Sequence, residues 1–317
     1  MNRRHFLHAG LSASVASVFS ATGGLAKPKN LDELSFIRLA VATICTDGFG
    51  NQHHEPAFKL IPQLGVRNVE FNLWYDDLLT PAYWDSLLKR CQDTGLTPVC
   101  VQGSAFGGAG AEGIKKDVAH KLKLLQAAKH LGCRRVKCTG SKRGTKGGLA
   151  SVIAVCKELA PAFEEAGALL LLENHANNVL ENIADYDTIF EQIDSPNVGL
   201  CLDTGHFEGA GIQLADVVER FHSRTLHIDL KDCKAFGKGH DTVVFGEGVT
   251  DFTAFLDLVT RRNFHGYMVL EQAWAEPREP IVEDLRKGVA MFRKFERGWG
   301  VRVAFALITG RIVSLGQ

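Results

Sequence analysis

The sequence has no excess of charge of either sign, because 36 lysine and arginine residues balance 36 aspartate and glutamate residues. Proteins that bind nucleic acid or anionic membranes usually concentrate positive charge. The chain also contains no run of the roughly 18 uncharged apolar residues that a membrane-spanning helix needs. We therefore expect a small molecule as the partner, with no nucleic acid and no stable insertion into a membrane.

Cysteine pairs of the C-x-x-C type are also absent, although the chain has eight cysteines. Without such pairs, a structural zinc cluster is not expected. Cys45, Cys100, Cys138 and Cys201 stand in apolar runs, where thiols behave as small buried hydrophobes. No G-x-G-x-x-G motif follows the first apolar run, which argues against an open dinucleotide-binding sheet.

The first 26 residues differ from the rest of the chain in composition. Arg3 and Arg4 come first, a mildly apolar stretch follows over residues 9–21, and small residues precede Lys27. This order is typical of a secretory signal, and the Arg-Arg-x-Phe-Leu core resembles the twin-arginine export signal. The alternative is a slightly basic N-terminus without fixed structure. We predict a signal over residues 1–26 that engages the twin-arginine translocation machinery, and hence a periplasmic or otherwise exported protein.

From residue 37 onward, short apolar runs alternate with longer amphipathic ones. Eight such pairs, in a chain with 45% apolar residues, favour a closed (β/α)8 TIM barrel of the α/β class over an open doubly wound sheet. We expect the barrel over residues 36–296, followed by a C-terminal tail, residues 297–317, without an assigned role. The predicted strands are residues 37–43, 68–72, 97–102, 135–139, 168–173, 198–203, 225–229 and 266–271, and the predicted helices are residues 55–64, 81–94, 114–131, 148–166, 185–193, 214–222, 252–262 and about 280–296.

Acidic side chains end four consecutive predicted strands, the fifth to the eighth. Glu173, Asp203, Asp229 and Glu271 stand there on the face that points into the barrel, since alternate residues of a strand share a face. His227 shares that face with Asp229. Taken singly, each acid could cap a helix or be solvated. Four acids converging on the rim where barrels build active sites would repel one another, unless a cation neutralises them or their pKa values are raised.

Five short motifs contain these acids or lie near them in the sequence. They are Leu172-Glu173-Asn174-His175, Leu202-Asp203-Thr204-Gly205-His206, His227-Ile228-Asp229-Leu230-Lys231-Asp232, Gly246-Glu247-Gly248 and Leu270-Glu271. In combination they resemble the xylose-isomerase-like barrel superfamily, which includes sugar-phosphate isomerases and epimerases, inosose dehydratases and a type-IV endonuclease. The resemblance covers nearly all of residues 36–296.

The resemblance implies a metal site whose ligands include Glu173, Asp203 and Glu271. The fourth ligand departs from the family pattern, His-Leu-Lys-Asp, because its histidine aligns with Asp229. We expect Asp229 to be that ligand, with His227 behind it as the alternative. Oxygen and nitrogen donors of this kind suit a divalent ion, with Mn²⁺ favoured and Mg²⁺, Co²⁺ or Zn²⁺ as alternatives.

The implied reaction is isomerisation or epimerisation of a sugar or keto-sugar. The ion would polarise a carbonyl group, while Glu173 and Glu271 remove and return a proton on the neighbouring carbon. The residues expected to contact the substrate are His206, His227, Lys231, His175 and Glu70. Trp74 and Trp274 could cover a sugar ring.

Several of these residues could instead have a purely structural role. His206 could be a helix-capping or buried histidine, and Lys231 could only pair with a neighbouring carboxylate such as Asp229. Gln102 and Lys137 share the lumen face and could shape the pocket or form salt bridges. Lys142, Arg143 and Lys146 form a basic loop that is more readily solvated than bound to phosphate.

Two other functions are compatible with the sequence. A metal-dependent lyase or dehydratase would use the same enediolate to expel a neighbouring substituent. An exported sugar-binding barrel without catalysis is the alternative outside enzymology. Neutral charge disfavours an endonuclease. A homo-oligomer is possible, and the sequence does not decide the oligomeric state.

Overall fold

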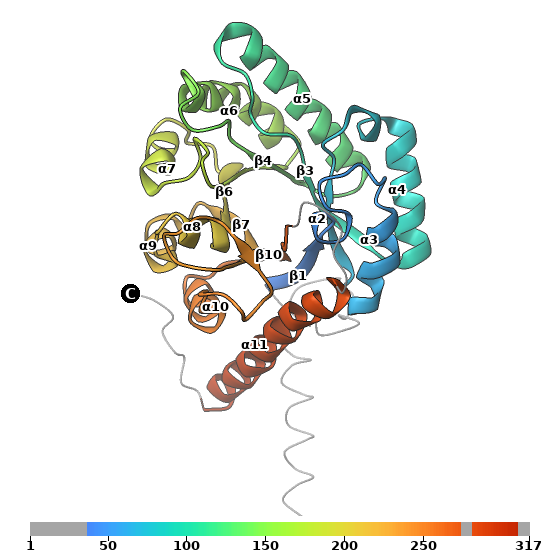
Figure 1. The fold of residues 1–317 in the computed structure, drawn as a ribbon, viewed down its shortest axis with the longest axis vertical. Helices are drawn as coiled ribbons and strands as arrows, with labels where there is room; N and C mark the ends of the chain where they lie inside the picture. Colours follow the sequence, from blue (N-terminus) through green and yellow to red (C-terminus); the bar gives the residue numbers. More distant parts are fainter. Residues whose placement is uncertain (1–36, 274–280, 310–317) are drawn as a thin grey trace, which may run out of the picture. The chain divides into compact units, whose positions relative to one another are not determined.

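The structure, a computed structural model, describes residues 37–273 and 281–309. Eight parallel strands close into a barrel in the order β1-β10-β7-β6-β5-β4-β3-β2, and helices surround it (Figure 1). The predicted signal over residues 1–26, Trp274 and residues 310–317 lie outside the described residues. The strands are β1 (Ile37–Ala42), β2 (Asn68–Asn72), β3 (Thr97–Gln102), β4 (Arg135–Thr139), β5 (Leu169–Glu173), β6 (Val198–Asp203), β7 (Thr225–Leu230) and β10 (Gly266–Leu270).

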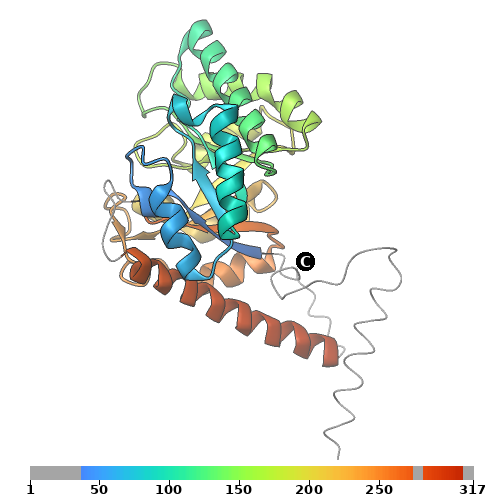
Figure 2. The ribbon, with the colours of Figure 1, turned by 90° about the vertical axis from the view of Figure 1, so that its right-hand side faces the viewer.

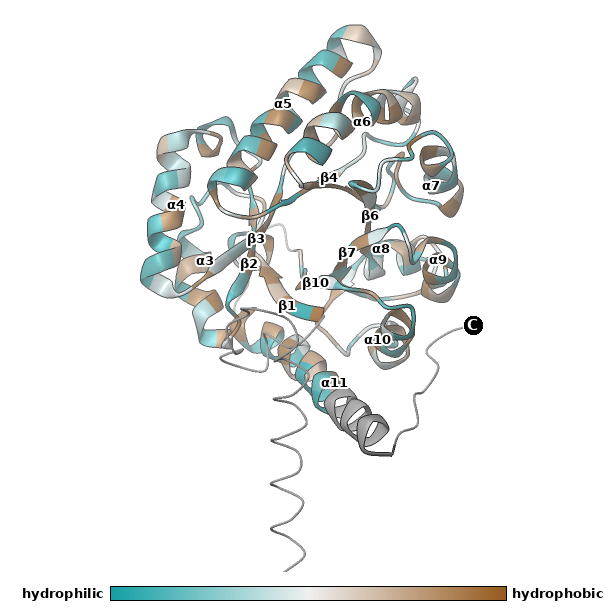
Figure 3. Ribbon diagram, turned by 180° about the vertical axis from the view of Figure 1, so that it is seen from behind, coloured by the Kyte–Doolittle hydropathy of each residue, from teal (hydrophilic) through white to brown (hydrophobic). Residues whose placement is uncertain are grey.

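The closed barrel confirms the fold class predicted from the alternating pattern. Strands are largely hydrophobic, whereas outer helices such as α4 and α5 carry both polar and apolar segments (Figure 3). This contrast follows from burial of the strands between the lumen and the helical layer. The helices of the outer layer are α3 (Glu55–Leu60), α4 (Pro81–Thr94), α5 (Gly110–His130), α6 (Gly148–Glu165), α7 (Ile183–Phe190), α9 (Leu214–Phe221), α10 (Phe252–Arg261) and α11 (Ile281–Thr309).

Several short elements at the ends of strands were not predicted. They are too short for a helical or alternating period to be read in the sequence. They place side chains at the rim of the barrel, where the site is built. These elements are α2 (Ile44–Asp47), η3 (Asp76–Leu78), α8 (Thr204–Gly209) and the antiparallel pair β8 (Asp232–Cys233) and β9 (Thr242–Val243). The helix predicted over residues 55–64 is α3 followed by a 3-10 turn, η2 (Ile61–Leu64).

The last helix, α11, packs against η2, α10 and β10 on one side of the barrel (Figures 1 and 2). Arg293 donates a hydrogen bond of 2.9 Å to the carbonyl oxygen of Gly65, which ends η2 with a positive φ of 66°. The helix runs past residue 296, where we expected the tail to begin. In the described part of the chain, no helix combines the length and the apolar character needed to cross a membrane.

The turn at Gly246-Glu247-Gly248 leads toward α10 and is held by one carboxylate. Asp232 accepts hydrogen bonds from the backbone N–H groups of Gly246 at 2.8 Å, Gly248 at 3.0 Å and Thr250 at 3.2 Å. A side chain at Gly248 would come within 2.1 Å of that carboxylate. The turn therefore has a structural reason for its glycine, and its backbone N–H groups have a carboxylate of the chain as acceptor.

Candidate functional site

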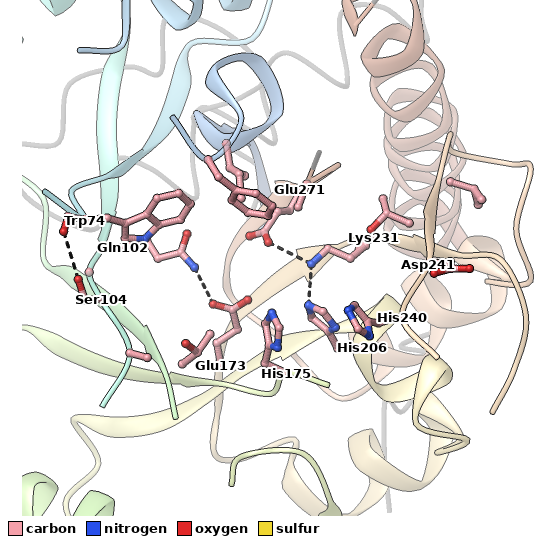
Figure 4. A pocket seen from close by; sticks show the side chains of 18 of the residues that line it. Trp74, Gln102, Ser104, Glu173, His175, His206, Lys231, His240, Asp241 and Glu271 are labelled. Carbon is pink, nitrogen blue, oxygen red and sulfur yellow. Dashed lines mark hydrogen bonds and ion pairs between the residues drawn. The ribbon is translucent and has the colours of Figure 1, made fainter. Parts of the chain in front are cut away.

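A cavity of about 830 Å³ opens at the rim formed by the carboxyl ends of the strands. Five residues predicted for the site line it together, and Figure 4 shows their side chains gathered around it. Its other walls include the aromatic pair Phe49 and Trp74, whose ring centroids lie 6.1 Å apart. The five predicted residues are Glu173, His175, His206, Lys231 and Glu271.

Lys231 lies at the floor of the cavity, and its ammonium group donates hydrogen bonds to three acceptors. Its Nζ lies 2.6 Å from Asp203 Oδ2. It also lies 3.0 Å from His206 Nε2 and 3.1 Å from Glu271 Oε1, and Figure 4 shows these two contacts. An ammonium group has no acceptor site, so Nε2 of His206 must accept this hydrogen bond. We call Lys231, Asp203, His206 and Glu271 the floor cluster.

The short helix α8 fixes two members of the floor cluster. Asp203 ends β6 and caps α8, since its Oδ1 accepts a hydrogen bond of 2.9 Å from the backbone N–H of His206. The helix-capping alternative for Asp203 is therefore confirmed, but the other oxygen of the same carboxylate contacts Lys231. One residue thus both begins the helix and faces the cation, and α8 holds His206 beside it.

A second lysine, Lys137 of β4, lies in a fully buried layer beneath the cavity. Its Nζ is 2.6 Å from Glu70 Oε1, 2.6 Å from Asp229 Oδ2 and 2.7 Å from Glu271 Oε2. Lys137, Glu70 and Asp229 are 0% exposed, and none of them is among the described residues that line the cavity. We call Lys137 with Glu70, Asp229 and Glu271 the buried cluster.

Lys231 pairs with carboxylates, as the alternative interpretation allowed, but Asp229, the example named there, is not one of them. Lys231 pairs with Asp203 and Glu271, while Asp229 pairs with Lys137. The difference arises because Lys231 follows the end of β7 and turns toward the rim, whereas Asp229 stays one layer deeper. Proximity in the sequence therefore does not identify the carboxylates that contact Lys231.

His227 and Glu70 were expected to contact the substrate, but both are 0% exposed and lie under the floor of the cavity. His227 Nε2 is 3.2 Å from Glu70 Oε2 and 3.8 Å from Asp229 Oδ1. The first distance is within hydrogen-bond range and the second is not. His227 thus orients Glu70 and gives Asp229 no hydrogen bond. Burial lowers the pKa of His227, so the imidazole is neutral near pH 7.

The two glutamates of the cavity have contrasting environments. Glu173 accepts a hydrogen bond of 2.8 Å from the neutral amide of Gln102, and its nearest ammonium, that of Lys137, is 3.8 Å away. Burial raises the pKa of Glu173 to about 8, although the lysines oppose the rise. Burial also acts on Glu271, but Lys137 and Lys231 outweigh it and hold the pKa of that carboxyl well below its usual range. At neutral pH one glutamate therefore carries a proton and the other does not.

Three histidine rings gather on one wall of the cavity. His175 and His206 have ring centroids 4.0 Å apart, and His240 lies 5.6 Å from His206. Burial, followed by the charge of Lys231, lowers the pKa of both His175 and His206, so both are neutral near pH 7. His240 was not predicted, because it comes from the connection between β8 and β9, which shows no pattern in the sequence.

The basic loop after β4 does not face the cavity as a set. Arg143 donates to Glu181 at 2.9 Å and to Asp185 at 2.5 Å, and Lys142, Arg143 and Lys146 are not among the described cavity-lining residues. The charge of Arg143 is thus already paired within the chain. The structure therefore gives no support to the alternative that this loop binds a phosphate group.

The two clusters and Glu173 contain more carboxyl groups than cations. In the two clusters and Glu173, five carboxyl groups surround only two ammonium groups. Burial raises the pKa values of Glu173, Asp203 and Asp229, so these carboxyl groups hold protons more readily than exposed ones. A cation could replace these protons. Among the described residues, ligand atoms of Glu173, Asp203 and His206 lie within 4.8 Å of one another, as do those of Glu70, Asp229 and Glu271. The donor set therefore fits a divalent ion.

The sequence model of the xylose isomerase-like TIM barrel family matches residues 58–295, which is more than half of the chain. This chain belongs to that family. The family includes enzymes that modify sugars and related polyols.

Relatives of this family differ in their reactions. The chain is 27% identical over 132 residues to an inosose dehydratase of Mesomycoplasma hyopneumoniae, a match that covers 37% of this chain and 44% of the relative. It thus spans less than half the length of this curated relative. A 3-keto-D-glucoside 4-epimerase from E. coli superposes with a TM-score of 0.64 and 18% identity over 81% of this chain and 99% of the other.

A zinc-bound IOLI protein superposes with a TM-score of 0.66 and 18% identity, covering 82% of this chain and 98% of that one. At such identities, the solved structures support the fold alone. The reaction must therefore be argued from the site of this chain.

Proposed function

We propose that this chain isomerises or epimerises a keto-sugar by moving a proton on the carbon beside the carbonyl group. The observation that carries the proposal is the contrast between Glu173 and Glu271, which line one cavity in opposite protonation states. Environments that push two carboxyl pKa values apart produce an acid and a base. The cavity of about 830 Å³ has room for a sugar.

A divalent cation is part of this proposal, with Mn²⁺ as the favoured ion and Mg²⁺, Co²⁺ and Zn²⁺ as alternatives. Glu173, Asp203, His206 and Glu271 are the residues of the cavity floor that could hold it. Bound there, the ion would supply electrophilic stabilisation of negative charge on the substrate's carbonyl oxygen.

The protein residues would perform the proton transfers. Without an ion, Glu271 is ionised and Glu173 carries a proton. With the ion bound, that proton is displaced; Glu271 would then remove the proton from the substrate carbon, and Glu173, on the far side of the cavity, would return a proton taken up from solvent. Gln102 holds Glu173 in place through its hydrogen bond of 2.8 Å. His175 and Lys231 also line the cavity and would bind substrate hydroxyl groups.

The proposal is tested with Glu173→Gln and Glu271→Gln in a panel of keto-sugars in D₂O. We expect each variant to keep its fold and to lose on the order of 100-fold in turnover, because each lacks one proton-transfer group. Nuclear magnetic resonance would follow deuterium entering the substrate beside the carbonyl. Glu247→Gln is the control, because Glu247 is exposed and pairs with Lys287 on the surface. Near wild-type exchange in both glutamine variants would refute the scheme.

A lyase reaction is the second candidate, supported by the match to an inosose dehydratase. Removal of the same proton by Glu271 would then be followed by loss of a hydroxyl group from the next carbon, with Glu173 donating the proton that leaves with it as water. Ultraviolet absorbance distinguishes the two reactions, because elimination produces a conjugated enone and epimerisation does not.

We also propose that the twin-arginine pattern at Arg3 and Arg4 directs export. Replacing both residues with lysine should retain the protein in the cytoplasm, as seen by cell fractionation. Normal export of that double variant would exclude this pathway.

A further inference from the structure

Three hydrogen-bond acceptors, each of which could also be a metal ligand, converge on the ammonium group of Lys231. Asp203 Oδ2, His206 Nε2 and Glu271 Oε1 lie 2.6, 3.0 and 3.1 Å from its ammonium nitrogen. Because Nε2 of His206 accepts from the ammonium, its lone pair points at the same position as the two carboxylate oxygens. Such a lone pair is the ligand that imidazole offers to a metal ion.

Glu173 is a further oxygen donor beside two of these three groups. Its ligand atom lies within 4.8 Å of those of Asp203 and His206. All four residues are at most 4% exposed, yet Glu173, His206 and Glu271 line the cavity together with Lys231. An ion can therefore enter from the cavity, and the flexible lysine side chain can withdraw into it.

The two residues that sequence alignment offers as the fourth ligand belong to the other layer. Asp229 is 2.6 Å from Lys137, which also contacts Glu70 at 2.6 Å and Glu271 at 2.7 Å. His227 faces Glu70 at 3.2 Å. Lys137 extends from β4 into the interior and is 0% exposed. An ion entering from the cavity would have to displace its ammonium group, and within the described residues no open cavity beside Lys137 could receive it.

We propose that His206, and neither Asp229 nor His227, is the fourth ligand of the divalent ion, with Glu173, Asp203 and Glu271, and that Lys231 leaves this position when the ion binds. The proposal rests on the divalent ion of the proposed function. It gives three carboxylates and one imidazole, the donor types that the family pattern contains, although the imidazole comes from α8 instead of β7. Such a set favours Mn²⁺, Co²⁺ or Zn²⁺ over Mg²⁺.

The test uses the full chain loaded with Mn²⁺ and pulsed electron paramagnetic resonance, which detects a nitrogen nucleus bound to the ion. Wild-type protein should show nitrogen coupling, and His206→Gln should lose it and bind Mn²⁺ at least about 10-fold more weakly. His227→Gln, His175→Gln and His240→Gln are matched controls that should keep the coupling. Loss of coupling in His227→Gln, or its absence in wild-type protein that binds Mn²⁺, would overturn the proposal.

A second variant guards against misfolding of His206→Gln. His206→Asp places an oxygen donor at the same position, so it should retain Mn²⁺ without nitrogen coupling, and persistent coupling would overturn the assignment. Thermal melting reports the fold of each variant. These experiments measure metal binding and not turnover, so they test the ligand assignment even if the proposed reaction is wrong. Wild-type protein that binds no Mn²⁺ overturns the ligand assignment while leaving the glutamate test to decide the reaction.

Discussion

The floor cluster and the buried cluster contain the same kinds of groups, and they share Glu271. One oxygen of this carboxylate faces Lys231 at 3.1 Å and the other faces Lys137 at 2.7 Å. The clusters differ in access, because Lys231 lines the cavity and Lys137 is enclosed. A buried ion pair without access holds its geometry, whereas a pair beside a cavity can exchange its cation. Access to the cavity, and not residue type, therefore distinguishes the two clusters in this barrel.

The largest effect should follow from removing the enclosed cation. Lys137→Met leaves the carboxyls of Glu70, Asp229 and Glu271 without their common ammonium, and we expect a loss of about 3–5 kcal/mol in the free energy of unfolding. Urea unfolding of the ion-free protein measures it. Lys137→Met combined with Asp229→Leu removes a charge of each sign and should recover much of the loss. Equal instability of the single and double variants would show that the pair does not act as a unit.

Removing the cation of the floor cluster should cost less stability and change ion binding in the opposite direction. Lys231→Met should lower the free energy of unfolding by only about 1–3 kcal/mol, because water in the cavity can hydrogen-bond to the acceptors that have lost the ammonium group. It should bind Mn²⁺ more tightly than wild type, since no ammonium competes for Asp203 and Glu271. Calorimetric titration measures the affinity. Lys234→Met is the control, because Lys234 lines the cavity but belongs to neither cluster as defined. Weaker Mn²⁺ binding in Lys231→Met would argue against competition.

The pH dependence of ion binding sharpens the contrast further. Burial raises the pKa of Glu173 to about 8, so below that pH the carboxyl is protonated and an ion must displace the proton. The affinity for Mn²⁺ should therefore rise as pH increases from 6 to 8, by up to about tenfold per unit for each proton released, and then level off. Titrations in buffers of different ionisation enthalpy count the protons. Glu173→Gln should release fewer, and a flat wild-type profile would contradict the prediction.

The smallest effect concerns a neutral contact in the buried layer. The thiol of Cys201 donates to Asp229 Oδ2 at 3.1 Å. Cys201→Ala removes this donor and should cost about 1 kcal/mol in unfolding free energy without changing Mn²⁺ affinity. Cys201→Ser keeps a donor and should cost less. A change in Mn²⁺ affinity in Cys201→Ala would indicate that Asp229 does act on the ion.

Much of this molecule follows from sequence pattern alone. The period of the apolar runs placed all eight strands to within a residue at either end, because a strand enclosed on both faces must be short, branched and apolar. Side-chain alternation placed Glu173, Asp203 and Glu271 in the lumen near the carboxyl ends of their strands. The pattern within each strand is sufficient here, because closure of a parallel barrel brings the carboxyl ends of all its strands to the same rim.

The pairing of charges was decided only by the tertiary structure. Lys137 lies 92 residues from Asp229 and 134 from Glu271 in the chain, yet it contacts both. No sequence period relates side chains that meet across a lumen, because their heights depend on strand tilt and stagger. The same holds for α8, which sets His206 beside Asp203, and for the hairpin that brings His240 to the wall. Sequence thus determined which residues enter the barrel, and the closed geometry determined which acid meets which lysine and which of these pairs opens to a ligand.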